Sequence, residues 1–325
     1  MLHFRHFLNG DPPKLVALWQ ACTQYSGLLR PITVEMLEVQ VFNKPYFDHE
    51  GLIVAFDEAG LVGFAHAGFG PNDARTDIEH DLGTTALCLI HPRAVENTEL
   101  IDGLISRSEE YLRARGAKIL YGGSILPLNP FYLGLYGGSE LPGILESDRL
   151  LLSIFQSRGY QEIDRVPVLR RNLLNLKPSI DRRLMQIRRR TQIAVVEEPP
   201  VRTWWESWTE GEFERRELQL LDIRMGNQIA GLTLRKLEPP TVSTFHGSYG
   251  LVDLWVEEPS RRQGLGSYLL FEAFKYLHDL GVESLEAQTM QSNQTALNFY
   301  RKLGFEQVDT GIVLRKIGTT PTTES

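Results

Sequence analysis

Two periods of apolar and polar positions run along the chain and predict a mixed α/β protein. In segments 99–115 and 266–280, apolar residues recur at intervals of three and four, which gives a helix one apolar face. Gly116 and Gly281 follow these segments, and glycine is a common helix end. Short apolar runs typical of buried strands lie between them. In the first half such strands are expected at 2–7, 51–56, 61–68, 84–90, 118–121 and, as a closing strand pair, 160–171, with further helices at 14–23 and 148–157.

The second half repeats this order of elements. Met225, Gly226 and Asn227 form a turn signal between two strand-like runs, which indicates a hairpin. Strands are expected at 192–196, 216–222, 228–235, 249–256, 284–288, 305–309 and 312–315, with a helix at 295–303.

The letters of the chain also repeat. The string YLRARGAKIL from Tyr111 matches YLHDLGVESL from Tyr276, an offset of 165 residues, and IFQSRGYQEID from Ile154 matches FYRKLGFEQVD from Phe299, an offset of 145. Two matches in the same order indicate an internal duplication whose first copy carries 20 extra residues, within the loop 124–146. We therefore divide the chain into domains 1–174 and 175–317 and a polar, disordered tail, 318–325.

Composition narrows the class of function. A net charge of −7 and a pI near 5.7 argue against a nucleic-acid partner. The chain has no apolar run long enough to span a membrane, and its first residues lack the apolar core of a secretory signal, so a cytoplasmic location is expected. Cys22 and Cys88 are expected to be buried free thiols, and the scattered histidines predict no metal site.

The strongest chemical signal is LWVEEPSRRQGLG at 254–266. A strand ends there, a polar turn follows, and a helix begins near the second glycine. The unpaired N–H groups in the first turn of a helix, together with the helix dipole, favour a phosphate group. Gly264 and Gly266 lack a Cβ, so the backbone can approach a pyrophosphate closely, and Arg261 can add a charge-assisted contact.

The second signal is NQTALNFYRKLGF, which begins at Asn293. Asn293 is a good candidate for a helix N-cap. Ala296 and Tyr300 are four residues apart and therefore share one helical face. On this evidence alone, Tyr300 is more typical of a half-buried packing residue than of a catalytic one.

Together the two segments resemble the GNAT N-acyltransferase superfamily. The first is similar to its motif A, Q/R-x-x-G-x-G/A, and the second to its motif B, N-x-x-A-x-x-x-Y-x-x-x-G-F. The resemblance covers about 70 residues well, and the rest of the second half by the order of its elements. With the duplication, it implies an α/β (α+β) fold of two tandem GNAT domains, the type that includes mycothiol synthase. Each domain would be a mixed, largely antiparallel sheet flanked by helices.

The resemblance implies an acyl-CoA-dependent N-acyltransferase, in which the second domain transfers acetyl from acetyl-CoA to the primary amine of a small molecule. Backbone amides from Arg262 to Ser267 would hold the pyrophosphate of coenzyme A. The acyl-pantetheine would lie in a gap where 254–256 diverges from 285–288. The Val256 amide would polarise the thioester carbonyl. Tyr300 would protonate the leaving thiolate, and Asn293 would lie near the pantetheine arm. The residues expected around the coenzyme are Leu254, Trp255, Val256, Arg261, Arg262, Gln263, Gly264, Leu265, Gly266, Ser267, Asn293, Ala296, Phe299 and Tyr300.

A base must remove a proton from the substrate ammonium group. Asp253 and Glu257 lie at the two ends of the key strand, and strand alternation places both on the same face as Trp255. They are the candidates for this base, and the alternative is that both are solvated surface acids.

The first copy lacks the residues of both motifs. At the motif A positions the offset of 165 places Glu96, Glu99 and Ile101, whose charges and side chains oppose a pyrophosphate. At the motif B positions the offset of 145 places Asp148 and Phe155, and phenylalanine cannot donate a proton. We therefore expect the first domain to be a degenerate copy without catalysis.

Three questions stay open at this stage. The second domain is either an enzyme for acetyl or a longer acyl group, or an acyl-CoA-binding protein without catalysis. The loop 124–146 either covers a substrate cleft, mediates a homodimer or packs on the surface. The arginine-rich segment 182–190 either faces solvent or the other domain, or binds an anionic partner.

Overall fold

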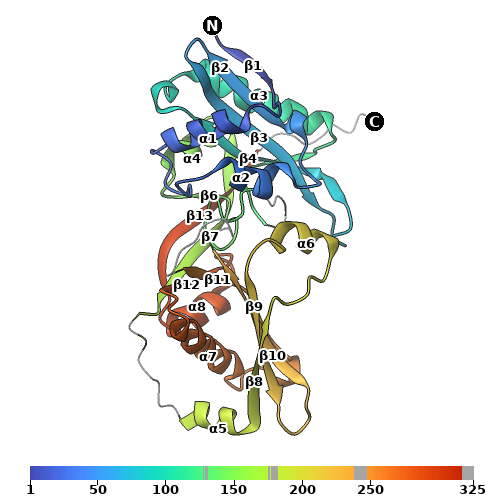
Figure 1. Ribbon diagram of the computed structural model, residues 1–325, viewed down its shortest axis with the longest axis vertical. Helices are drawn as coiled ribbons and strands as arrows, with labels where there is room; N and C mark the ends of the chain where they lie inside the picture. Colours follow the sequence, from blue (N-terminus) through green and yellow to red (C-terminus); the bar gives the residue numbers. More distant parts are fainter. Residues whose placement is uncertain (127, 129–130, 175, 177–181, 238–246, 317–325) are drawn as a thin grey trace.

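The computed structural model describes residues 1–126, 128, 131–174, 176, 182–237 and 247–316. The expected tail 318–325 lies outside these residues. The chain forms two lobes that share one 13-stranded sheet, with strand order β1-β2-β3-β4-β5-β13-β7-β12-β11-β10-β9-β8 and β6 paired to β13 (Figure 1). Among the described helices, none is long and apolar enough to cross a membrane.

The first half has the elements that the pattern predicts and adds a short helical segment. Its main helix, α3, covers Thr98–Ala114, against an expected 99–115. The short helix α2 (Val34–Leu37) and a π-helix (Glu38–Phe42) were not predicted. The remaining elements are β1 (His3–His6), α1 (Pro12–Ala21), β2 (Leu52–Asp57), β3 (Gly60–Pro71), β4 (Ile78–Ile90), β5 (Ile119–Gly122), β6 (Ile144–Leu145), α4 (Arg149–Gln156) and β7 (Tyr160–Asn172).

The second half repeats this series and begins with an additional helix. That helix, α5 (Arg182–Arg190), contains the arginine-rich segment, and α6 (Trp204–Glu210) was also not predicted. The remaining elements are β8 (Thr191–Glu197), β9 (Arg215–Asp222), β10 (Gln228–Lys236), β11 (Ser248–Val256), α7 (Leu265–Asp279), β12 (Ser284–Gln288), α8 (Gln294–Lys302) and β13 (Glu306–Lys316).

The two halves are joined by a long antiparallel pair, β7 and β13. The register runs from Glu306 opposite Arg170 to Lys316 opposite Tyr160. β13, from the second half, continues to pair with β5 of the first, whereas the end of β7 pairs with β12 of the second. Each half therefore contributes a strand to the sheet of the other, and Figure 1 shows both strands running from one lobe into the next.

This pairing corrects two sequence-based expectations. The closing strand pair at 160–171 is one continuous strand, and so are the two strands expected at 305–309 and 312–315. Gly311 is a glycine because Pro142 packs directly against its backbone, where a Cβ would collide. It does not mark a turn between two strands.

The loop 124–146, which carries the extra residues of the first copy, packs onto the second half. The carboxylate of Glu286 on β12 is 1% exposed and accepts the Ser139 N–H at 2.7 Å. It also accepts hydrogen bonds from Arg170 at 3.0 Å and from Gln288 at 3.2 Å. Arg235 donates to the Ser139 carbonyl. The loop thus packs against the other half of the same chain, an arrangement that was not among the three sequence-based alternatives.

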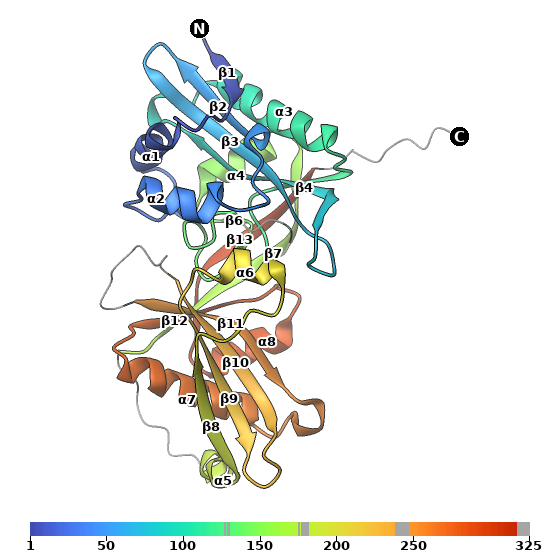
Figure 2. The same ribbon diagram turned by 45° about the vertical axis from the view of Figure 1, so that its right-hand side comes forward.

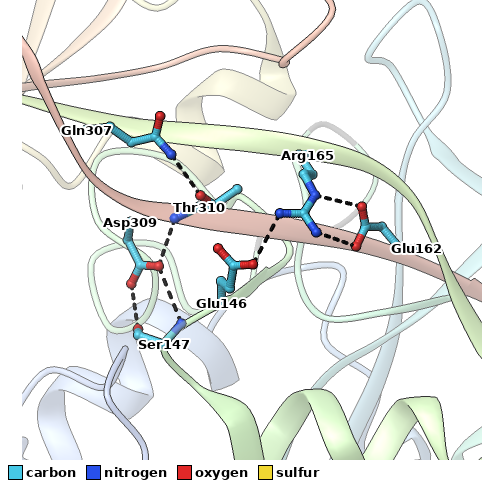
Figure 3. Close-up of polar contacts among 7 residues, drawn as sticks. All are labelled: Glu146, Ser147, Glu162, Arg165, Gln307, Asp309 and Thr310. Atoms are coloured by element: carbon cyan, nitrogen blue, oxygen red, sulfur yellow. Dashed lines mark hydrogen bonds and ion pairs between the residues drawn. The ribbon is translucent and has the colours of Figure 1, made fainter.

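The far end of the loop is held by β7 and β13 (Figure 3). Asp309 accepts hydrogen bonds from the Ser147 hydroxyl and from the Thr310 amide. Arg165 lies between Glu162, at 2.7 Å, and Glu146, at 3.1 Å. The loop is therefore fixed near its middle to β12 and β10, and at its end to the two strands that connect the halves.

Helix α6 adds apolar contact between the halves and lies at their junction (Figure 2). The Trp205 side chain is 3% exposed, and its ring centroid lies 4.7 Å from that of Tyr46 in the first half. The Lys44 ammonium donates to the Trp208 carbonyl at 2.6 Å.

Replacing Glu286 with alanine should lower the free energy of unfolding by about 2–4 kcal/mol, because the buried Ser139 N–H then loses its acceptor and Arg170 its carboxylate. Urea denaturation would measure this loss. Glu283→Ala removes an exposed glutamate three residues earlier and should change stability by no more than about 0.5 kcal/mol. Equal stability of the two variants would contradict the docking described above.

Candidate active site

A gap opens in the sheet of the second half between β11 and β12. These parallel strands pair only over Ser248–Leu251 and Ser284–Ala287. β11 continues to Val256 without β12 beside it, whereas Gln288 pairs with Val168 of β7. The expected divergence of 254–256 is therefore present, and it begins after Ala287.

The backbone of β11 directs N–H groups into this gap. The Glu257 amide donates to the Ile229 carbonyl of β10 at 2.9 Å, on the side away from the gap. Hydrogen bonding alternates along an antiparallel ladder, so the N–H groups of Val256 and Leu254 point away from β10. They face the space that β12 has left.

The first half contains the same gap, but its own side chains fill it. β4 and β5 pair only from Leu82 to Thr85, so Ile90 lies five residues past the last pair, as Val256 does in the second half. The Ile90 amide donates to the Tyr25 hydroxyl at 3.0 Å, and the Ile90 carbonyl accepts from the Cys22 thiol at 3.3 Å. Tyr25 is fully buried. The position equivalent to Val256 is thus occupied from within.

The loop after β11 and the start of α7 form an anion cradle. Arg262 and Gly264 have positive φ angles of 61° and 86°, and α7 begins directly after Gly264 with no side chain capping its first turn. Free amides at a helix N-terminus, preceded by left-handed residues, form a concave site for phosphate oxygens. Gly264 is required by its φ angle. A Cβ at Gly266 would meet nothing closer than 3.7 Å, so this glycine leaves open space.

Not all of the residues expected around the coenzyme face the cradle. Arg261 donates to the Val256 carbonyl at 3.1 Å and so connects the cradle to the strand. Gln263 is exposed, Ser267 is half-buried, and Leu265 is buried in the core.

Helix α5 places the arginine-rich segment beside the cradle. Arg183 donates to the Arg262 carbonyl at 3.1 Å, and Arg190 donates to the Gln263 side chain at 3.2 Å. The sequence indicated this segment only as a basic run, because nothing in the letters relates it to a loop some 80 residues away.

Helix α8 positions Tyr300 by its cap and its packing. The Asn293 side chain accepts the Ala296 N–H at 3.1 Å, which confirms the expected N-cap. The Tyr300 ring lies 5.3 Å from that of Phe305 and is half-buried. Burial raises the pKa of Tyr300 to about 12, and the negative charges of Glu140 and Asp253 add to the rise. The phenol is therefore protonated at neutral pH and can donate a proton.

A cavity of about 470 Å³ lies between the halves and contains one of the expected bases. Asp253 is exposed and lines it, whereas Glu257 is exposed and is absent from the described lining. The side chains that line the cavity come from both halves: Arg75, Leu126, Glu140, Pro199, Pro200, Arg202, Thr203, Glu206, Glu210, Arg215, Glu217, Thr233, Val252 and Asp253.

Glu140 is a member of this cavity that sequence reasoning missed. Burial raises its pKa to about 7, against the opposing effect of Arg235, and the carboxylates of Glu210 and Glu286 raise it further. The sequence showed only that the first copy has extra residues in the loop 124–146, and it did not indicate which of them would lie in a cavity.

The first half lacks the cradle, and its register needs one correction. The helix starts align Gly264 with Asn97 rather than with Glu99, because α3 begins at Thr98 and α7 at Leu265. The Asn97 side chain accepts the Leu100 N–H at 3.0 Å, so it occupies the first turn of α3 itself. Phe155 is fully buried in the core of the first half.

Known proteins match part of the chain in sequence and nearly the whole chain in fold. Residues 182–305 match the acetyltransferase (GNAT) family. The putative phosphinothricin acetyltransferase of Bacillus subtilis is 31% identical over 105 residues, which are 31% of this chain and 60% of that protein. The mycothiol acetyltransferase of Pseudarthrobacter chlorophenolicus is 30% identical over 98 residues, 29% of each chain. The matches thus span less than two thirds of either relative.

A tandem GNAT protein from the clavulanic acid biosynthesis pathway has the same fold. It superimposes with a TM-score of 0.68 at 14% identity and covers 99% of this chain and 100% of that one. Together with the gap between β11 and β12 and the uncapped start of α7, these matches show that the chain has the fold of a tandem GNAT protein and that residues 182–305 are similar in sequence to the acetyltransferase (GNAT) family.

Proposed function

We propose that the second half catalyses transfer of an acetyl group from acetyl-CoA to the primary amine of a small molecule. The observation that carries this proposal is the open gap beside β11, where the Val256 N–H is free to meet a carbonyl oxygen. The equivalent amide of the first half donates to Tyr25. One half thus retains a donor directed at the gap, and this difference supports the proposed roles of a degenerate domain 1–174 and a catalytic domain 175–317.

The residues around the gap fit a coenzyme A thioester. The amides of Arg262 to Ser267 would hold the pyrophosphate, with positive charge from Arg183 and Arg190 of α5 beside them. When bound, the thioester supplies an activated acyl group. The chain would contribute mainly position and a preorganised backbone donor at Val256, which together supply most of the rate enhancement in such reactions.

Tyr300 is proposed to protonate the departing sulfur. Its raised pKa keeps the proton on the phenol until a thiolate forms nearby. Of the two carboxylates expected as bases, Asp253 lines the cavity and Glu257 is absent from the described lining, so Asp253 is the better placed for an amine.

Acetyl-CoA should bind with one equivalent per chain in a calorimetric titration. The Gly264→Glu variant should abolish binding, because it adds a carboxylate at the cradle and a side chain at a φ of 86°. Gly10→Glu is the matched control and should bind as the parent does, since it adds the same carboxylate at an exposed position of the first half where a Cβ meets nothing within 4 Å. Two equivalents would show a working site in the first half, and no binding to the parent would refute the proposal.

The Tyr300→Phe variant should lower kcat by about 10²–10⁴-fold while the Kd for acetyl-CoA stays unchanged, because only proton donation is lost. Thiol release in the presence of an accepted amine would measure kcat. Tyr276→Phe is the control. It removes a hydroxyl of α7 that accepts a hydrogen bond from Arg216 of β9, and kcat should stay within about twofold of the parent value. An unchanged kcat for Tyr300→Phe would remove this residue from the mechanism.

A further inference from the structure

We infer that the first half completes the catalytic site of the second, with Glu140 as the base that takes the proton from the substrate ammonium group. This inference rests on the acetyl transfer proposed above. It assigns a role to the half that lacks a cradle, and to the extra residues of its loop.

The backbone around Glu140 is held against the second half. Gln288 of β12 donates to the carbonyl of Glu140 at 3.3 Å and to that of Gly137 at 3.2 Å. The neighbouring Ser139 is bonded through its amide to Glu286 and through its carbonyl to Arg235. These contacts come from β12 and β10, on both sides of the strand that borders the gap. The backbone at Glu140 is therefore held in place by hydrogen bonds to two strands of the sheet.

Glu140 shares the cavity with the strand that carries the oxyanion donor. Val252 and Asp253 of β11 line the same cavity, and Val256 lies at the end of that strand. The Tyr300 hydroxyl is within electrostatic reach of both Glu140 and Asp253. An amine held in the cavity would thus lie beside the Glu140 carboxylate of the first half, whose charge acts on the Tyr300 hydroxyl of the second.

Three of the five carboxylates that line the cavity already have side-chain partners, which leaves two as candidates for the base. Glu206 is paired with Arg215 at 2.6 Å, and Glu210 with Arg235 at 3.3 Å. Glu217 accepts from the side-chain amides of Gln219 and Gln228 at 3.2 and 3.3 Å. For Glu140 and Asp253, the described residues supply no ion pair or side-chain hydrogen bond of this kind.

Burial distinguishes these two. Asp253 is exposed, so water stabilises its charge, whereas Glu140 is half-buried and its charge is partly desolvated. A carboxylate in low-dielectric surroundings without a paired cation holds a proton more firmly than a solvated one, and so is the stronger base.

The proton balance closes with these groups. Glu140 takes one proton from the ammonium ion, and the neutral nitrogen forms a bond to the acyl carbon as the carbon–sulfur bond breaks. Tyr300 gives its proton to the departing sulfur and recovers one from the nitrogen of the new amide. The proton on Glu140 is released to solvent, so amide, thiol and one proton are produced.

The same step predicts a pH dependence. Glu140 must be ionised to accept a proton, so kcat/KM should rise as the pH increases through about 7, the value to which burial raises its pKa. The charged or titratable groups that face Glu140 are Glu210 of α6, Arg235 of β10, Asp253 of β11, Glu286 of β12, Tyr300 of α8 and Arg75 across the cavity.

The test compares Glu140→Gln with Glu146→Gln in the full-length protein. Glu140→Gln should lower kcat/KM by about 10²–10³-fold and abolish the rise near pH 7, with the acetyl-CoA Kd unchanged. Glu146→Gln removes the same charge from the same loop at an exposed position. Arg165 still has Glu162 as an ion-pair partner in this variant, so kcat/KM should stay within about twofold of the parent value. Ethylamine, putrescine and glucosamine would serve as acceptor amines, and the reaction would be monitored by the release of the coenzyme A thiol. A profile for Glu140→Gln equal to that of the parent would overturn the inference, as would loss of the rise in Asp253→Asn alone.

A second measurement separates this inference from the proposed function. If acetyl-CoA binds but none of these amines is acetylated, the proposed acceptor class fails, and the carboxyl of Glu140 can still be titrated by ¹³C NMR. The resonance would be assigned by its absence in Glu140→Gln. An apparent pKa near 7 supports a buried base, and an ordinary glutamate value of about 4.3 rejects it.

Discussion

The structure depends on the reciprocal pairing of β7 with β13. A closing strand from each half crosses into the sheet of the other, and the ladder between them joins two sheets into one. Because backbone hydrogen bonds in a central ladder cannot be exchanged for water without separating the sheets, the halves are held in one relative position. The cavity between them and the docking of the loop 124–146 both depend on that position.

The same duplicated architecture reaches two different outcomes at one backbone amide. Where the first half places Tyr25 on the Ile90 N–H, the second leaves the Val256 N–H open to the gap. Where the first half caps its helix with Asn97, the second has Gly264 and an uncapped first turn. Two side chains, Tyr25 and Asn97, thus separate a filled core from a site that can receive a ligand.

The sequence predicted local structure well and relations between distant segments poorly. The limits of α3, α7 and α8 fall within a residue of expectation, because apolar spacing and glycine ends are local signals. The strand exchange could not be predicted, since β7 and β13 have similar patterns and either could pair within its own half. Glu140 and α5 were missed for the same reason, as their neighbours lie on other parts of the chain. The offset of 165, which was set near the ends of the two helices, slipped by two at Asn97 because α3 has 17 residues and α7 has 15.

The place of β13 in the sheet has a consequence for the order in which the protein can form. This strand ends the described chain, yet it lies between β5 and β7, in the middle of the fold. During synthesis the first half emerges complete except for that strand, and the side of β5 that will receive it stays exposed until β13 has also left the ribosome. The half that is synthesised first therefore completes its sheet only after the second half has been synthesised, and the two halves fold as one unit.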